Sequence, residues 1–337
     1  MTPKPCLLAV LFFVAFGFGE DVQQRADGLI QHARELSDIR SPNAPAFRLR
    51  ATFSFTGEDL ETIQGTFTET WVSNAQWRRE TKAMDLHRLE VGGTNRRWLA
   101  EDSKELPMPA AGVPAIMDIF PSRFGKLGFE SIRDRNPQDT GTECAITKPF
   151  GADEERSAFC FDKRSGVLVE RISPEPIGIR VADYACQYGA FSRFGKYLFP
   201  RQIDCFLDGH RKLQANITEL MLEPSPDAAL FVPPAGSIEL GNCSGKAESP
   251  QPVSTPEPSF PRGYRDRSYR GRSTRVMLSL IVDKNGKTQG VKVLRSGGKA
   301  FDEEAVNNVH SWRFKAATCD GETVATQMSV EIKFQLR

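Results

Sequence analysis

An alternating run at the end of the chain constrains the fold more than any other feature of the sequence. From Met328 to Leu336, apolar residues occupy every second position, and polar or charged residues stand between them. Side chains of a strand point alternately to the two faces of its sheet, so this period of two predicts a strand with one buried face. The chain therefore ends in a sheet, and earlier segments must supply its other strands.

Residues 275–295 predict a β-hairpin that pairs with this last strand. The β-branched and aliphatic run 275–282 ends in Asp283-Lys-Asn-Gly286, and Asn-Gly favours the positive φ angles of a tight turn. The return strand covers residues 288–295 and stops at Ser296-Gly-Gly298, whose backbone freedom ends the pairing.

A helix is expected between the hairpin and the final strand. Apolar residues recur at helical spacing from Phe301 to Trp312. Asp302 is the expected N-cap, and Glu303 and Glu304 follow in the first turn, where the helix dipole favours negative charge. The element order is ββαβ, a small sheet with one helix across it.

Residues 263–337 resemble the C-terminal domain of TonB proteins, which contact outer-membrane receptors in Gram-negative bacteria. The matching motifs are Val282-Asp-Lys-Asn-Gly286, Lys292-Val-Leu-Arg-Ser-Gly297, Phe301-Asp-Glu-Glu-Ala305 and Trp312-Arg-Phe-Lys315. The resemblance implies a domain that binds a partner peptide by adding it to a sheet edge. We expect the terminal strand to be that edge, with partner-binding residues Met328, Val330, Glu331, Ile332, Lys333 and Phe334.

The beginning of the chain predicts export. Residues 1–19 have the layout of a signal peptide: Lys4, an apolar run over residues 7–18, and small residues at Gly17-Phe-Gly19. The run is shorter than the roughly 20 residues of a membrane-spanning helix. We expect cleavage after Gly19 and a periplasmic protein, with an inner-membrane anchor formed by residues 7–18 as the alternative. TonB proteins couple to a proton-driven motor through a histidine in their membrane helix, and this run contains no histidine.

Cysteine content agrees with export. Six cysteines follow the predicted signal peptide: Cys144, Cys160, Cys186, Cys205, Cys243 and Cys319. An even number in an oxidising compartment favours disulfides. The first two flank a predicted hairpin, the next two lie in successive predicted strands, and the last two remain to pair with each other. Buried free thiols are the alternative, because the sequence does not fix the connectivity.

Residues 20–236 predict an antiparallel sheet with helices, so the fold class is α+β. An amphipathic helix at residues 22–36 precedes a long strand at residues 47–55 that has one aromatic face. Short strands separated by polar or glycine-containing turns follow. A short helix at residues 113–120, with Pro114 in its first turn, interrupts them. This spacing predicts a curved sheet.

The order of these elements resembles periplasmic lipoprotein carriers of the LolA/LolB type. Those proteins fold an antiparallel sheet into an open half-barrel covered by helices, and they hold acyl chains in its concavity. The matching features are the first helix, the tryptophan-bearing strands, the inserted helix, Gly195-Lys-Tyr-Leu-Phe-Pro200 and the closing run Ala229-Leu-Phe-Val-Pro233. The resemblance implies a hydrophobic pocket lined by Phe47, Phe53, Phe55, Trp71 and Trp77. A closed core made by the same residues is the alternative.

Residues 237–262 predict a linker between the two domains. Its second half holds five prolines among serine, glutamate and threonine, a composition that favours an extended and fairly stiff chain. At about 3.1 Å per residue, such a linker would separate the domains by a few tens of ångströms.

The sequence contains no catalytic constellation, cofactor motif or metal-ligand spacing. Asp153-Glu-Glu155 fits a polar turn, the acidic pair after Asp302 fits a helix start, and the glycine pairs lack the spacing of a phosphate loop. The net charge of +1 does not favour nucleic acid. We therefore expect a non-enzymatic periplasmic protein. Its expected partner is an outer-membrane TonB-dependent receptor or another envelope protein, and a lipid or lipoprotein ligand of the first domain is the alternative.

Overall fold

The structure is a computed structural model that describes residues 18–56, 61–103, 106–120, 127–136, 138–149, 155–177, 180–243, 245–261, 264 and 273–335. Residues 1–17, and with them nearly all of the predicted signal peptide or anchor, lie outside this described part. Helix α1 (Phe18–Ser37) begins where the apolar run ends. Among the described residues, no helix combines the length and the apolar character needed to cross a membrane.

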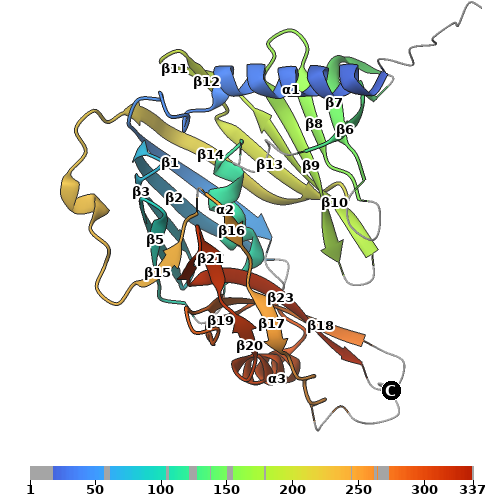
Figure 1. The fold of residues 1–337 in the computed structure, drawn as a ribbon. Helices are drawn as coiled ribbons and strands as arrows, with labels where there is room; N and C mark the ends of the chain where they lie inside the picture. The colour runs from blue at the N-terminus through green and yellow to red at the C-terminus, as the bar shows by residue number, and fades with distance from the viewer. Residues whose placement is uncertain are drawn as a thin grey trace, which may run out of the picture.

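One open sheet of 13 strands forms the N-terminal unit, which we define as residues 18–241 (Figure 1). Its strand order is β15-β5-β4-β3-β2-β1-β14-β13-β10-β9-β8-β7-β6, and every paired neighbour is antiparallel. The sheet curves, with α1 across one end of its strands and α2 against its concave inner face (Figure 1). The predicted curved antiparallel sheet is confirmed.

The strands of this sheet follow one another closely along the chain. Their bounds are β1 (Phe47–Thr56), β2 (Thr62–Ser73), β3 (Gln76–Ala83), β4 (Leu86–Gly93), β5 (Arg96–Glu101), β6 (Phe129–Asn136), β7 (Asp139–Thr147), β8 (Ala158–Asp162), β9 (Leu168–Ile177), β10 (Arg180–Gly189), β13 (Gln202–Leu207), β14 (His210–Leu222) and β15 (Ile238–Gly241). A separate short hairpin joins β11 (Ser192–Phe194) and β12 (Tyr197–Phe199). A single-turn 3-10 helix, η2 (Ala228–Phe231), precedes β15.

Helix α2 (Met108–Met117) begins five residues before the predicted start at residue 113, and Pro114 lies inside it instead of in its first turn. A proline in a helix interior costs roughly 3 kcal/mol. The buried side chains Val113, Ile116 and Met117 offset that cost, since burying an aliphatic side chain contributes about 1.5–3 kcal/mol. Packing on the sheet therefore decides where this helix lies.

Two glycines on the inner face make room for aromatic rings of neighbouring strands. Gly65 is opposite Phe53, and Gly92 is opposite Trp77. A Cβ atom at Gly65 would lie 2.3 Å from the Phe53 ring and 2.5 Å from the carbonyl oxygen of Lys82. The rings can lie against the adjacent strand only because these positions lack side chains.

The C-terminal unit, which we define as residues 273–335, holds a second sheet with the order β19-β18-β23. Strands β18 (Ser273–Val282) and β19 (Thr288–Arg295), helix α3 (Lys299–His310) and strand β23 (Thr326–Gln335) follow in chain order. Three short strands stand between α3 and β23: β20 (Arg313–Lys315), β21 (Ala317–Cys319) and β22 (Glu322–Val324). The predicted ββαβ order therefore leaves out these three strands.

Helix α3 starts at Lys299, so the predicted N-cap at Asp302 is wrong. Gly298 is the N-cap, with φ of +103°, a conformation that favours glycine. The carboxylate of Asp302 instead accepts hydrogen bonds from the Gly297 N–H at 2.8 Å and from the Ser296 hydroxyl at 2.5 Å. Asp302 thus stabilises the loop that leads into the helix.

The connecting segment, residues 242–261, lies along the C-terminal unit. Strand β16 (Ala247–Glu248) pairs with β21, and β17 (Gln251–Ser254) pairs with β20. Phe260 packs against the rings of Phe301 and Phe334. The segment is extended, as its prolines predict, but its strand pairing keeps it against the C-terminal unit instead of holding the two units apart. The predicted domain boundaries stay predictions.

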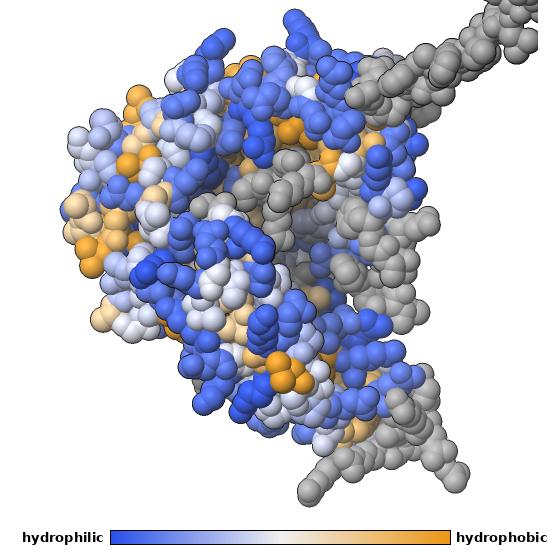
Figure 2. Space-filling view, viewed as in Figure 1, coloured by the Kyte–Doolittle hydropathy of each residue, from blue (hydrophilic) through white to orange (hydrophobic). Residues whose placement is uncertain are grey.

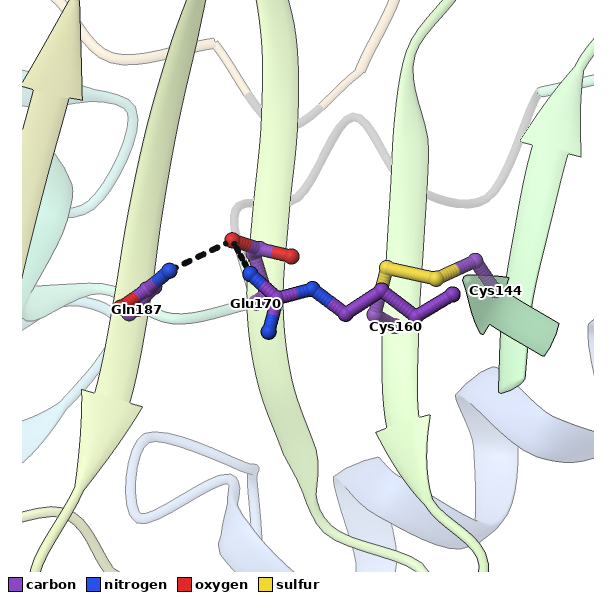
Figure 3. Close-up of a disulfide and its surroundings, with 5 residues drawn as sticks. Cys144, Cys160, Glu170 and Gln187 are labelled. Carbon is purple, nitrogen blue, oxygen red and sulfur yellow. Dashed lines mark hydrogen bonds and ion pairs between the residues drawn. A yellow bond between two sulfur atoms is a disulfide. The ribbon is translucent and has the colours of Figure 1, made fainter. Parts of the chain in front are cut away.

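Three disulfides join the six cysteines. Cys144–Cys160 links β7 to β8, Cys186–Cys205 links β10 to β13, and Cys243–Cys319 links the connecting segment to β21. These are the pairs that the predicted strand positions favour. Figure 3 shows the first of them beside Glu170 of β9, which accepts a hydrogen bond from Gln187 of β10 at 2.9 Å.

Replacing Gly65 with alanine tests the contact between Phe53 and the neighbouring strand. We expect Gly65→Ala to lower the free energy of unfolding by about 1–3 kcal/mol, because the new methyl group must displace a buried ring beside a fixed carbonyl. The matched control is Gly28→Ala in α1, where an added Cβ would have no other part of the structure within 4 Å beyond the helix's own backbone. There alanine should raise the free energy of unfolding by up to about 1 kcal/mol. Urea denaturation measures both changes. Equal stability of Gly65→Ala and the parent protein would contradict the packing.

Candidate functional site

The outer edge of β23 is the candidate site for a protein partner. On its inner side, β23 pairs with β18 in a register that runs from Ser273 opposite Gln335 to Val282 opposite Thr326. No strand within the described residues pairs with the other side of β23. An unpaired edge presents backbone N–H and C=O groups that an extended peptide can pair with.

The N-terminal unit limits this free edge at one end. The N–H of Gly241, at the end of β15, donates a hydrogen bond to the carbonyl oxygen of Ala325 at 2.8 Å, directly before β23 begins. The opposite edge of the sheet is also engaged, since the N–H of Leu106 donates to the carbonyl oxygen of Val293 in β19 at 3.1 Å. The edge available to a partner therefore lies within Thr326–Gln335.

The predicted partner-binding residues fall on both faces of β23. Ile332 and Phe334 are buried in the core beneath α3, and Met328 and Val330 are half-buried against that core. Glu331 and Lys333 are exposed. Glu331 already forms an ion pair with Arg275 of β18. The polar side chains of β23 are thus the exposed ones, whereas the apolar ones hold the strand in place.

The aromatic residues predicted to line a hydrophobic pocket lie together in the main core of the N-terminal unit. Each is at most 8% exposed, and the five are Phe47, Phe53, Phe55, Trp71 and Trp77. The Phe47 and Trp71 rings stack with 5.6 Å between their centres. Residues of α2 belong to the same buried cluster. The helix and the rings thus pack together in one core, and a hydrophobic pocket formed by these residues stays a prediction.

Buried charges continue the inner face beyond these aromatic residues. Glu69 of β2 has a fully buried side chain and forms ion pairs with Arg40 and with Arg79 of β3, the latter at 2.8 Å. Arg40 also donates a hydrogen bond to the carbonyl oxygen of Met117 at 2.9 Å. Burial alone would raise the pKa of Glu69, but the two guanidinium groups outweigh it and lower the pKa to about 2.

The same row of charges extends across β4 and β5 to the edge of the sheet. Glu90 forms ion pairs with Arg88 at 3.2 Å and with Arg97, and Arg88 forms a second pair with Glu101 at 2.5 Å. Burial favours a raised pKa for Glu90, yet these arginines lower it to about 2. We call these residues the charged row: Arg40, Glu69, Arg79, Arg88, Glu90, Arg97 and Glu101.

The C-terminal unit completes the charged row. Lys292 of β19 pairs with Glu101 at 2.7 Å, and the Gln327 side-chain oxygen accepts a hydrogen bond from Arg88 at 3.0 Å. The sequence of β2 alternates, and this alternation predicts where the Glu69 side chain lies. Glu69 is in phase with Phe67 and Trp71, so its side chain must point to the same face of the sheet. Nothing in the sequence showed which residues would neutralise it.

A polar cavity of about 340 Å³ lies where the two units meet, near the Cys243–Cys319 disulfide. Its lining includes Arg96, Glu239, Lys284 and Asp320. Glu239 forms ion pairs with Lys284 at 3.2 Å and with Arg96 at 3.6 Å. Asp320 accepts a hydrogen bond from the backbone N–H of Lys246 at 2.8 Å. The predicted aromatic residues are not among those that line the cavity.

Figure 2 shows one face of the molecule, with hydrophilic residues over most of it and hydrophobic residues in several smaller groups. The fold and the edge together define a class: a disulfide-bonded β protein whose small C-terminal unit carries a strand with one unpaired edge among the described residues.

Comparison with known proteins identifies the C-terminal part more specifically. Residues 256–336 match the family model described as the Gram-negative bacterial TonB protein C-terminal. The protein TonB of Vibrio cholerae serotype O1 is 31% identical over 81 residues, which are 24% of this chain and 32% of that protein. The match thus spans about a third of that relative's length. The resemblance to TonB that the sequence motifs predicted is confirmed.

Solved structures similar to the N-terminal part include members of the LolA superfamily. A LolA superfamily protein from Nitrosomonas europaea has a TM-score of 0.43 and 13% identity, and the match covers 61% of this chain and 97% of that one. A domain from Vibrio parahaemolyticus, named as an outer-membrane lipoprotein-sorting protein, has a TM-score of 0.40 and 12% identity, with the same coverage.

The pKa values of Glu69 and Glu90 predict acid sensitivity. Both pKa values are lowered from 4.5 to about 2. Their contribution to stability is therefore complete above about pH 4.5 and is lost as the pH falls toward 2, because protonation then favours the unfolded chain. In Glu69→Gln, we expect a lower free energy of unfolding at pH 7 and a shallower decrease below pH 4.5. Urea denaturation across this pH range measures both.

Glu130→Gln is the matched control for this experiment, because Glu130 forms a more exposed pair with Arg156. In this variant, the free energy of unfolding should fall below pH 4.5 about as steeply as it does in the parent protein. If the free energy of unfolding of Glu69→Gln fell as steeply below pH 4.5 as that of the parent protein, the buried carboxylate would not be the cause of the acid sensitivity.

Proposed function

We propose that this chain is an exported envelope protein that docks a partner protein through the outer edge of β23 and so supports transport across the outer membrane. The unpaired edge, in a unit that matches the TonB C-terminal family model, is the observation that carries this proposal. Strand addition to such an edge needs mainly backbone hydrogen bonds, so the partner must supply an extended segment. The proposed partner is an outer-membrane TonB-dependent receptor or another envelope protein, and the proposed location is the periplasm.

Side chains on β23 give this docking a chemical preference. Lys333 is exposed on the strand, whereas the carboxylate of Glu331 is engaged by Arg275. An acidic residue of the partner facing Lys333 would form an opposite-charge cross-strand pair, which contributes roughly 0.2–1 kcal/mol. The apolar residues of β23 face α3, so the partner gains little from hydrophobic side chains on that side.

Peptide binding tests the docking. We expect N-terminal peptides of outer-membrane receptors to slow hydrogen exchange of amides within Thr326–Gln335 in the full chain, because each new backbone hydrogen bond protects a donor. The control peptide has the same sequence with alternate residues N-methylated, which removes the donors needed for pairing. Exchange measured by mass spectrometry during the titration gives the readout. No protection of β23 at millimolar peptide would contradict the proposal.

A second candidate function is the carriage of a lipid, a lipoprotein acyl chain or another hydrophobic ligand in the N-terminal unit. The observation that favours it is the aromatic cluster under α2, a helix with Pro114 in its interior and no side-chain cap at its N-terminus. Such a helix is held mainly by packing. An acyl chain that replaced its buried side chains would restore the lost apolar contacts.

Native mass spectrometry tests the second function. The full chain purified from the periplasm should carry a bound species of lipid mass, because an emptied aromatic site would be filled by the most abundant apolar ligand. Val113→Asp in α2 should raise the occupancy, because it weakens the packing that keeps the helix in the site, and Ala111→Asp on the half-buried side of the same helix is the control. Protein without bound lipid, isolated under gentle conditions, would contradict this function.

A further inference from the structure

Contacts between the two units are mostly polar and lie on the concave side of the N-terminal sheet. Lys292 reaches both the Glu101 carboxylate, at 2.7 Å, and the backbone carbonyl of Ser103. Gln327 accepts from Arg88 at 3.0 Å and donates to the Ser279 hydroxyl, also at 3.0 Å. Strand register places Arg88 and Glu101 in one row with Phe67 on the inner face. The C-terminal unit therefore covers the charged part of the concavity.

The apolar contribution to this contact is small. One cluster between the units has four buried members: Leu99, Leu240, Ile281 and Ala325. In addition, Leu294 of β19 packs against the edge of the main core. Each unit also has a larger core of its own, so separating the units would expose the residues of this small cluster and Leu294 but neither main core.

The charged row stays paired without the C-terminal unit. Each of its carboxylates has an arginine partner on the N-terminal unit: Glu69 has Arg40 and Arg79, Glu90 has Arg88 and Arg97, and Glu101 has Arg88. Removing Lys292 and Gln327 leaves no carboxylate of the row alone. A paired polar surface regains water at a lower cost than an apolar face. The contact is thus of a kind that can open without unfolding either unit.

The chain also has a defined point about which the C-terminal unit can turn. Strand β15 stays on the N-terminal sheet through Gly241, which is opposite Arg96. Cys243 is already bound to Cys319 of the C-terminal unit. Asn242, the one residue between these two anchors, is held to the N-terminal unit by a backbone hydrogen bond from its N–H to the carbonyl oxygen of Asn95 at 2.9 Å, which a turn at this point would break. The connecting segment beyond it is paired with β20 and β21 and would move with the C-terminal unit.

We propose that the C-terminal unit is a lid on the concave face of the N-terminal sheet, and that it opens as one body about Gly241–Asn242. Opening breaks the Lys292 and Gln327 contacts and the Leu106–Val293 hydrogen bond, separates Leu99 and Leu240 from Ile281 and Ala325, and frees the Leu294 contact at the edge of the main core. It uncovers the part of the charged row on β4 and β5. It also removes the Gly241–Ala325 hydrogen bond that limits the β23 edge. The Cys243–Cys319 disulfide keeps the opened lid beside the sheet. This proposal does not depend on the identity of a partner or ligand.

Charge reversal at the interface tests the lid. Lys292→Glu places a carboxylate beside Glu101, and Gln327→Arg places a guanidinium beside Arg88 and Arg97, so the two variants act from different strands. Lys333→Glu, at an exposed position of β23, is the matched control for charge. Hydrogen exchange of the full, oxidised chain is measured by mass spectrometry for all three variants and for the parent protein.

If the C-terminal unit is a lid, we expect faster hydrogen exchange only at amides on the two sides of the contact between the units. Amides of residues 97–103, 289–295 and 326–328 should exchange about tenfold faster or more in Lys292→Glu and in Gln327→Arg. Amides inside α3 and in β10 and β13 should keep their protection. No change relative to Lys333→Glu would overturn the proposal. Loss of protection throughout either unit in both variants would also overturn it, since the two units would then form a single cooperative core.

Discussion

The buried ion pair between Arg40 and Glu69 holds together several parts of the N-terminal unit. Arg40 follows α1, Glu69 lies on β2, and the same guanidinium group bonds the carbonyl oxygen of Met117 at the end of α2. It also lies over the Phe47 ring, 5.6 Å from its centre. A buried charge without its partner is strongly destabilising, so the positions of the two helices and the sheet depend on one another here.

The charged row that starts at this pair also determines how the two units meet. On β1 and β2 the inner face is largely aromatic and packs under α2, whereas on β4 and β5 it is charged and meets the C-terminal unit. Polar groups from β19 and β23 can satisfy such a surface, and α2, which is almost wholly apolar, cannot. This difference in chemistry along one sheet explains why α2 packs on one part of the concave side and the C-terminal unit on the other.

Among the described residues, the small C-terminal sheet keeps one largely free strand edge, that of β23. In the C-terminal unit, β18 is central, β19 meets the segment before α2, and β23 meets β15 only at its start. Docking at the remaining edge and opening of the lid would therefore be linked, because both involve the first residues of β23. If both proposals hold, a partner at the edge would bias the position of the lid, and the lid would control access to the concavity.

How far the sequence predicts the structure differs between elements for identifiable reasons. The period-two pattern of β1 placed its aromatic residues correctly on one face, and the motifs of residues 275–337 identified the C-terminal unit. Strand β6, Phe129–Asn136, has no alternation in its sequence, and it becomes a strand by pairing with β7. The connecting segment was expected to separate the units, and long-range pairing with β20 and β21 places it against one of them instead. Helix α2 was displaced from its predicted start because packing outweighs the local preference of Pro114.

The sequence by itself determined the strand periods, the hairpins, the residues that could form disulfides and the family resemblance of the C-terminal part. These features depend on neighbours in the chain or on short motifs, so they can be recognised locally. Tertiary structure alone decided the partners of Glu69, Glu90 and Glu101, the position of the C-terminal unit on the concave face and the extent of the free edge of β23. Each of these depends on groups far apart in the sequence, and a buried charge is tolerated only where folding brings its counter-charge within reach.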